Sequence, residues 1–157
     1  MKTLGHNSLM ILIIILVVFS SSSFSPRCEA LFQWSTGVEV HVMNALLSSS
    51  PILVRCQSKN DDLGYHTLAV YDEFRWNFKS HVFSRTLFFC HFYLDAEQKE
   101  SVFDTYTEDL ALDHCGNYPD KNHYRCYWLA REDGFYLGPD LNHTSAFVKL
   151  NEWQKRV

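Results

Sequence analysis

Features that mark common enzymes and nucleic-acid-binding proteins are missing from this chain of 157 residues. It has no G-x-S-x-G segment, which forms the nucleophile elbow of the common serine hydrolases. It has no stripe of lysine and arginine, and its formal net charge of −4 argues against binding along nucleic-acid phosphates. The alternating acids of an EF-hand calcium loop are also absent. We therefore expect neither an enzyme nor a nucleic-acid binder, and we assign no catalytic residue, metal or cofactor.

A membrane-spanning apolar segment is lacking too. The run Leu9–Phe19 has 11 residues, whereas a spanning helix needs roughly 20. A basic start at Lys2 precedes it, and small residues follow it as far as Ala30. This order is typical of a cleavable secretory signal, and the shortness of the run argues against the alternative, an uncleaved anchor. We expect residues 1–30 to be removed and residues 31–157 to form a secreted, extracellular domain that does not insert into a membrane.

The cysteine count supports export to an oxidising compartment. Cleavage after Ala30 removes Cys28, one of the five cysteines. Four then remain: Cys56, Cys90, Cys115 and Cys126. An even set in a secreted chain indicates disulfides, so the zinc-like grouping of His114 and His123 with two of these cysteines is better explained by a disulfide cysteine beside solvent-facing histidines. Four cysteines allow three pairings, and the sequence does not choose among them.

Alternation of apolar and polar side chains recurs along the rest of the chain. It is clear in Val38–Met43, Ile52–Gln57 and Phe74–Lys79, and it is typical of strands with one buried face. Thr86–Leu94 is apolar on both faces, as in a central strand, and Ser101–Thr107 is rich in β-branched and aromatic residues. Two further runs complete the series: Tyr124–Leu129 and Phe135–Leu137. The predicted fold is all-β, a small antiparallel sandwich of about eight short strands stabilised by two disulfides, with one helical turn at Glu108–Asp113.

Several segments share their order and spacing with the plant self-incompatibility S-protein homologues. They are Asn60–Leu68 (D-D-L-G-x-H-x-L), Phe74–Phe78 (aromatic-x-W-x-F), Thr86–Cys90 (T-x-F-x-C), Phe103–Tyr106, Cys126–Trp128 and Glu132–Tyr136. Together with the four-cysteine frame, they make the chain resemble this family from about Val38 to Tyr136. One departure is Leu94, where the family often has tryptophan. The resemblance implies a small, secreted antiparallel β-sandwich. For the self-incompatibility members it implies a female ligand that a pollen membrane receptor reads.

We therefore expect an extracellular signalling ligand, a monomer that binds a membrane receptor protein in self-incompatibility or developmental signalling. Loops on a rigid frame are the usual place for such binding. The loops expected to do so are Asn44–Pro51, Gln57–Tyr65, Asp95–Glu100 and Asp113–Asn122. Within them, seven residues are candidates for receptor contact: Asn60, Asp61, Asp62, Glu97, Lys99, Asn117 and Lys121. The alternative is an apoplastic defence or carbohydrate-binding module with exposed tyrosines as a sugar platform: Tyr71, Tyr93 or Tyr127.

Two smaller motifs carry local expectations. Asn142-His143-Thr144 is an N-glycosylation sequon in what reads as an exposed loop. Asp61 and Asp62 precede Leu-Gly, a setting in which carboxylates usually accept backbone N–H groups in a solvated turn. His66 follows that turn, and a structural hydrogen bond to it explains the histidine.

Overall fold

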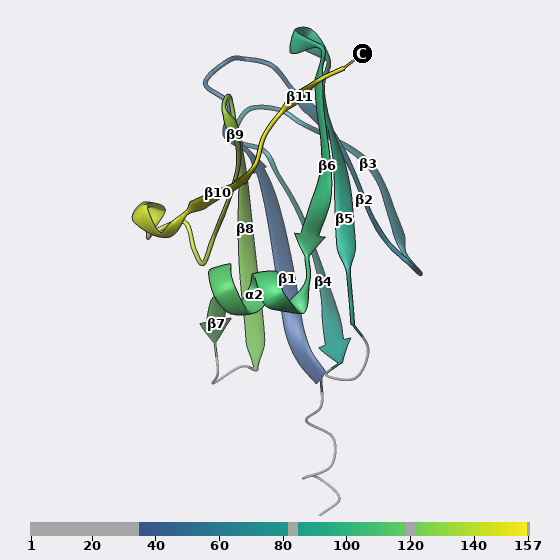
Figure 1. The fold of residues 1–157 in the computed structure, drawn as a ribbon, viewed down its shortest axis with the longest axis vertical. Coiled ribbons are helices and arrows are strands. Elements are labelled where there is room, and N and C mark those ends of the chain that lie inside the picture. The colour runs from purple at the N-terminus through teal and green to yellow at the C-terminus, as the bar shows by residue number, and fades with distance from the viewer. Residues whose placement is uncertain (1–34, 82–84, 119–121, 157) are drawn as a thin grey trace, which may run out of the picture. The chain divides into compact units, whose positions relative to one another are not determined.

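The computed structural model describes residues 35–81, 85–118 and 122–156, in which two β-sheets face each other (Figure 1). The strands are β1 (Ser35–Asn44), β2 (Ile52–Ser58), β3 (Asp62–Leu68), β4 (Glu73–His81), β5 (Phe88–Leu94), β6 (Lys99–Tyr106), β7 (Gly116–Tyr118), β8 (His123–Arg131), β9 (Gly134–Gly138), β10 (Val148–Asn151) and β11 (Gln154–Lys155). The helices are the short 3-10 turns η2 (Asp95–Glu97) and η4 (Thr144–Ala146) and the α-helix α2 (Glu108–His114). The predicted all-β fold is confirmed.

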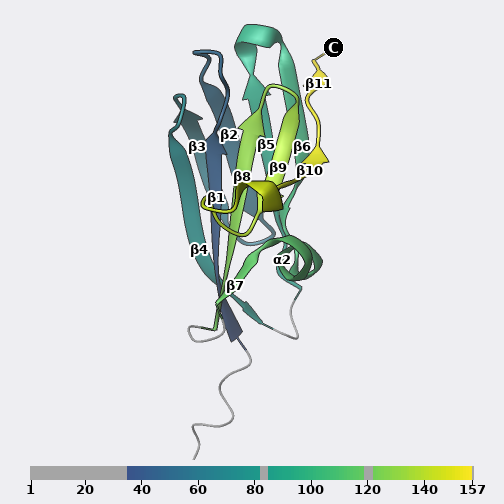
Figure 2. The same ribbon diagram turned by 90° about the vertical axis from the view of Figure 1, so that its left-hand side faces the viewer.

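One sheet has the strand order β10-β9-β8-β1-β4, with β7 paired to β8, and the other has the order β11-β6-β5-β2-β3. Figure 2 shows the six-stranded sheet in front, with β4, β1, β8 and β9 from left to right. Neighbouring strands run antiparallel except for β1 and β8, which are parallel. This one parallel pair departs from the purely antiparallel sandwich expected from the sequence.

Aromatic side chains from both sheets fill the space between them. Phe92 of β5 meets Phe135 of β9 at 4.6 Å between ring centres, and Phe103 of β6 meets Trp128 of β8 at 5.0 Å. The indole N–H of Trp128 donates to the carbonyl of Thr105 over 2.8 Å, so its polar atom is satisfied inside the core. Burying each such side chain contributes about 1.5–3 kcal/mol. These contacts make a rigid frame for whatever the outer faces carry.

Two disulfides brace the frame, as expected, and the structure selects one of the three possible pairings. Cys56 and Cys90 join β2 to β5, where they are also register partners in the ladder. Cys115 and Cys126 join the end of α2 to β8. The second disulfide therefore ties the irregular segment after the helix to a central strand.

The strand runs in the sequence account for seven of the strands, and β3, β7, β10 and β11 were not anticipated. β3 begins at Asp62, inside a segment that looks like a turn because of its acids and glycine. Gly64 has φ +78° there, which glycine tolerates without strain.

The expected helical turn is present as α2, capped by Thr107, whose hydroxyl accepts the N–H of Leu110 over 3.1 Å.

The predicted signal segment 1–30, including Cys28, lies outside the described residues. Among the residues that are described, no helix is long and apolar enough to cross a membrane.

Candidate recognition face

The outer face of the five-stranded sheet carries aromatic, charged and aliphatic side chains side by side. β5 alternates between buried and half-buried residues, so Phe88, Cys90 and Phe92 point into the core. Phe89, His91 and Tyr93 consequently point outward. The run that appears apolar on both faces in the sequence thus places aromatic rings at the protein surface. We define the recognition face by seven residues: Arg55, Tyr65, His91, Tyr93, Glu100, Val102 and Arg156.

A row of side chains crosses four neighbouring strands of this face. Tyr65 on β3 lies opposite Arg55 on β2, Arg55 lies opposite His91 on β5, and His91 lies opposite Val102 on β6. The Arg55 guanidinium lies 5.1 Å from the centre of the Tyr65 ring, within the range of a cation–π contact. Tyr65 and Val102 at the two ends are 58% and 55% exposed. The row therefore offers large side chains to a partner on one outer face of the sheet.

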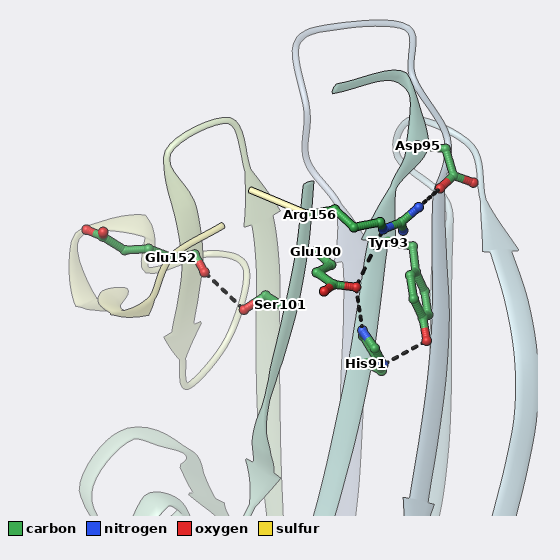
Figure 3. Close-up of polar contacts among 7 residues, drawn as sticks. All are labelled: His91, Tyr93, Asp95, Glu100, Ser101, Glu152 and Arg156. Carbon is green, nitrogen blue, oxygen red and sulfur yellow. Dashed lines mark hydrogen bonds and ion pairs between the residues drawn. The ribbon is translucent and has the colours of Figure 1, made fainter. Parts of the chain in front are cut away.

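Hydrogen bonds fix the aromatic side chains in the middle of the face (Figure 3). The Tyr93 hydroxyl lies 2.7 Å from Nδ1 of His91, and Nε2 of His91 lies 3.2 Å from Glu100 Oε2. Because a carboxylate only accepts, the neutral ring that fits has its proton on Nε2 and accepts the Tyr93 O–H at Nδ1. Burial raises the pKa of Tyr93 above its ordinary value, with Tyr65 and Glu100 adding to the effect, so the phenol keeps the proton that it donates.

Arg156, which is distant in the sequence, also contacts this cluster. Its Nη1 donates to Asp95 Oδ1 over 2.9 Å, and its Nε lies 3.5 Å from Glu100 Oε2 (Figure 3). Its guanidinium also lies 5.2 Å from the centre of the Tyr93 ring. The backbone N–H of Arg156 donates to the carbonyl of Gln98 over 2.8 Å. Side chain and backbone together attach this residue to the β5–β6 hairpin.

The segment that leads to Arg156 is anchored along its length. The hydroxyl of Ser101 donates to the carbonyl of Glu152 over 3.0 Å (Figure 3). The indole N–H of Trp153 donates to the carbonyl of Arg131 over 2.7 Å, and its ring packs 4.4 Å from that of Phe135. These contacts therefore attach the segment that carries Arg156 to the rest of the sandwich.

A small pocket opens beside Tyr93 at the β1–β2 loop end of the same face. It has a volume of about 260 Å³, and its walls include Pro51, Leu53 and Ala96. An apolar hollow next to a fixed aromatic ring is the kind of place where an anchor side chain of a partner protein inserts. The pocket brings together two of the expected recognition loops, Asn44–Pro51 and Asp95–Glu100.

The predicted contact residues are divided between the two ends of the sandwich (Figure 1). Asn60 and Asp61 form the β2–β3 turn, in which both backbone N–H groups donate to the Ser58 hydroxyl. Glu97 and Lys99 lie at the β5–β6 turn at the opposite end, where they form an ion pair with N–O distance 2.5 Å. The sequence-based set is therefore not one contiguous site.

The remaining candidates have local structural roles. Asp62 holds Arg55 through two oxygen contacts of 2.5 and 3.3 Å and accepts the N–H of Gly64 over 3.0 Å. These bonds hold the pKa of the Asp62 carboxyl below its ordinary value. Asn117 donates to the Tyr124 hydroxyl over 3.3 Å. Lys121 lies outside the described residues.

Two further expectations concern aromatic and histidine residues. Tyr93 and Tyr127 lie on opposite outer faces, and Tyr71 lies in the β3–β4 turn, so the three do not form one sugar platform. His66 has Nε2 2.8 Å from the carbonyl of Leu63, in agreement with a structural role. In residues 35–81, 85–118 and 122–156, no three His, Cys, Asp or Glu side chains are placed to hold a metal ion.

Sequence reasoning missed four residues of the recognition face: Arg55, His91, Val102 and Arg156. Tyr65 and Glu100 stand at the ends of two expected loops, and Tyr93 was a candidate for the alternative sugar platform. The available signal was the second, outward-facing aromatic set of Thr86–Leu94. Which residues lie beside it depends on the register of β2, β5 and β6, and no local pattern reports that register.

Comparison with known proteins agrees with the fold. A family model described as plant self-incompatibility protein S1 matches residues 39–153. S-protein homolog 19 of Arabidopsis thaliana is 35% identical over 124 residues, which cover 78% of this chain and 81% of that protein. S-protein homolog 1 of the same plant is 34% identical over 100 residues, and the match spans 63% of this chain and 61% of that relative.

A solved structure of a self-incompatibility protein homologue is similar in fold. It matches with a TM-score of 0.55 and 24% identity, over 76% of this chain and 96% of the other. It is described as representing a widespread family of small, highly stable, secreted proteins from plants. The chain therefore belongs to the plant self-incompatibility protein S1 family.

Proposed function

We propose that this protein is an extracellular signalling ligand that binds a membrane receptor protein through the recognition face. The observation that supports the proposal best is the row Tyr65–Arg55–His91–Val102, which presents tyrosine, arginine and an aliphatic side chain on one face of the sheet. Tyrosine and arginine are enriched in protein interfaces and dominate their binding energy.

Preorganisation supports the same assignment. His91, Tyr93 and Glu100 are already held by hydrogen bonds, and Arg156 is held by Asp95. Ordering a free side chain on binding costs about 0.5–1.5 kcal/mol, so a surface that is already ordered avoids much of that cost. In this proposal residues 1–30 are a cleaved secretory signal, and the mature monomer acts outside the cell.

Binding of labelled, disulfide-bonded protein to plant plasma membranes tests the proposal. Tyr65→Ala and Val102→Asp are expected to weaken saturable binding by about tenfold or more, because each removes a large exposed side chain at one end of the row. Leu112→Ala is the matched control, since Leu112 is a 68% exposed aliphatic residue on α2. Circular dichroism and thermal melting check that all three variants keep the fold.

A glycan array separates this function from the alternative. If neutral or acidic glycans bind through Tyr65 and Val102 while membranes bind no better than a denatured sample, the receptor proposal is wrong. The apoplastic carbohydrate-binding module then takes its place.

A further inference from the structure

A cleft at the other end of the sandwich has a charge that differs from that of the whole chain. Residues of the β2–β3 turn, the end of β4 and the start of β5 line it, and its volume is about 770 Å³. Figure 1 shows where these elements lie in the fold. The described lining of the cleft includes four basic residues: Lys59, Lys79, His81 and Arg85. Asp61 is the only acid among the described lining residues, although the chain carries a formal net charge of −4.

These basic groups are available to a ligand. In the described part of the chain, Lys59, Lys79 and Arg85 are exposed and make no ion pair. Asp61 is already engaged, because its carboxylate accepts the Ser58 hydroxyl over 3.3 Å and its carbonyl accepts the Ser58 N–H over 2.7 Å. The basic groups outnumber the one acid of the described lining, so the local potential is positive, which attracts an anion.

The neutral lining indicates which kind of anion fits. Leu87 is 41% exposed at the cleft, and the partly buried Phe78 and Phe89 also line it. Apolar and aromatic surface packs against the C–H face of a sugar ring, whereas an amide such as that of Asn60 hydrogen-bonds hydroxyl groups. We propose that this cleft binds an anionic oligosaccharide, with the basic residues pairing its acidic groups. The site is separate from the recognition face and does not depend on the receptor proposal.

Isothermal titration of the mature, disulfide-bonded protein tests this proposal. The probes are a carboxylated oligomer (oligogalacturonate), a sulfated one (dextran sulfate), a neutral cello-oligosaccharide and polyglutamate. Binding of either anionic sugar, screened by added salt, is the expected result. The stronger of the two identifies carboxylate or sulfate as the preferred acidic group. Failure of both, or polyglutamate binding that equals the stronger sugar, would overturn the proposal.

Variants locate the binding to the cleft. Lys79→Gln and Arg85→Gln together are expected to lower the affinity for the sugar by about tenfold, because two exposed charge contacts are lost. Lys155→Gln is the control, since Lys155 is an exposed lysine of β11 that makes no ion pair in the described chain. Loss of sugar binding equally in the control would place the interaction elsewhere. Membrane binding of the double variant is expected to stay unchanged, which keeps the two proposals distinguishable.

Discussion

The guanidinium of Arg156 lies over the ring of Tyr93 and donates to Asp95, so the C-terminal segment completes the surface formed by the β5–β6 hairpin. Arg156 and Asp95 are 61 positions apart in the sequence. Because Tyr93 also bonds His91, a change at Arg156 reaches the middle of the recognition face.

Replacing Arg156 by alanine is expected to reduce the free energy of unfolding by about 1 kcal/mol, because one cation–π contact and two partly exposed ion pairs are lost. The loss of binding free energy to the receptor is expected to exceed this loss of unfolding free energy. Arg156→Lys keeps the charge but not the planar contacts, so it is expected to rescue only part of the binding. Urea unfolding and membrane binding measure the two effects. Unchanged affinity of the Arg156→Ala protein would show that Arg156 takes no part in receptor binding.

The Arg55–Asp62 ion pair makes part of the stability depend on pH. Arg55, followed by the Gly64 N–H, lowers the pKa of Asp62 from its ordinary value of 3.8. A carboxyl with a lowered folded-state pKa stabilises the fold above its unfolded pKa, and this contribution disappears as the pH falls through the lowered value. Arg55→Met is therefore expected to destabilise the protein near neutral pH, and the part of that effect due to the ion pair is expected to disappear as the pH falls through the lowered pKa of Asp62.

Arg75→Met is the control for that pH dependence, since Arg75 is exposed on β4 and makes no ion pair among the described residues. An NMR titration of the Asp62 carboxyl checks the cause directly. If Asp62 titrates at the same pH in the wild type and in Arg55→Met, the ion pair does not set its pKa.

The two disulfides are expected to contribute unequally. Cys56–Cys90 closes a sequence separation of 34 residues and Cys115–Cys126 one of 11. Loop-closure entropy then predicts stabilisation of about 4 and about 3 kcal/mol respectively. The double variants Cys56→Ala/Cys90→Ala and Cys115→Ala/Cys126→Ala can be compared by urea unfolding. A larger loss from the second pair would show that native packing around Cys115, and not chain entropy, decides the order.

Asn142 is expected to carry an N-linked glycan in plant tissue. The residue is exposed in the segment between β9 and β10, so the sequon is accessible. Glycosidase treatment is expected to increase gel mobility of the wild type, and Asn142→Gln is expected to show the increased mobility without treatment. An unchanged gel position in the wild type would contradict this expectation.

Local sequence patterns predicted much of the frame for identifiable physical reasons. The alternation in Val38–Met43 and Phe74–Lys79 reflects one buried face, which β1 and β4 have. Thr86–Leu94 predicted a central strand, and β5 lies between β2 and β6. β3 was missed because its acids and Gly64 are turn residues, yet pairing with β2 imposes the strand. The short β10 and β11 exist through pairing with β9 and β6, which no local pattern encodes.

The site was less predictable than the frame. Loop position selected Asn60 and Glu97, which the fold places at opposite ends. Arg55 and His91 become neighbours only through the register of β2 on β5, and Arg156 joins them only through the fold of the last strands. Side-chain alternation identifies which residues share a face, but it does not identify which strands lie beside each other.

Photo-crosslinking on intact plasma membranes shows whether the recognition face touches a membrane protein. A photoreactive amino acid at position 102, at the end of the exposed row, is compared with one at position 75 on the opposite sheet, both in the disulfide-bonded protein. Position 102 is expected to give a single saturable membrane-protein adduct that excess unlabelled protein abolishes, and position 75 is expected to give none. An adduct from position 75 alone, or no competed adduct from position 102, would contradict receptor binding through the recognition face.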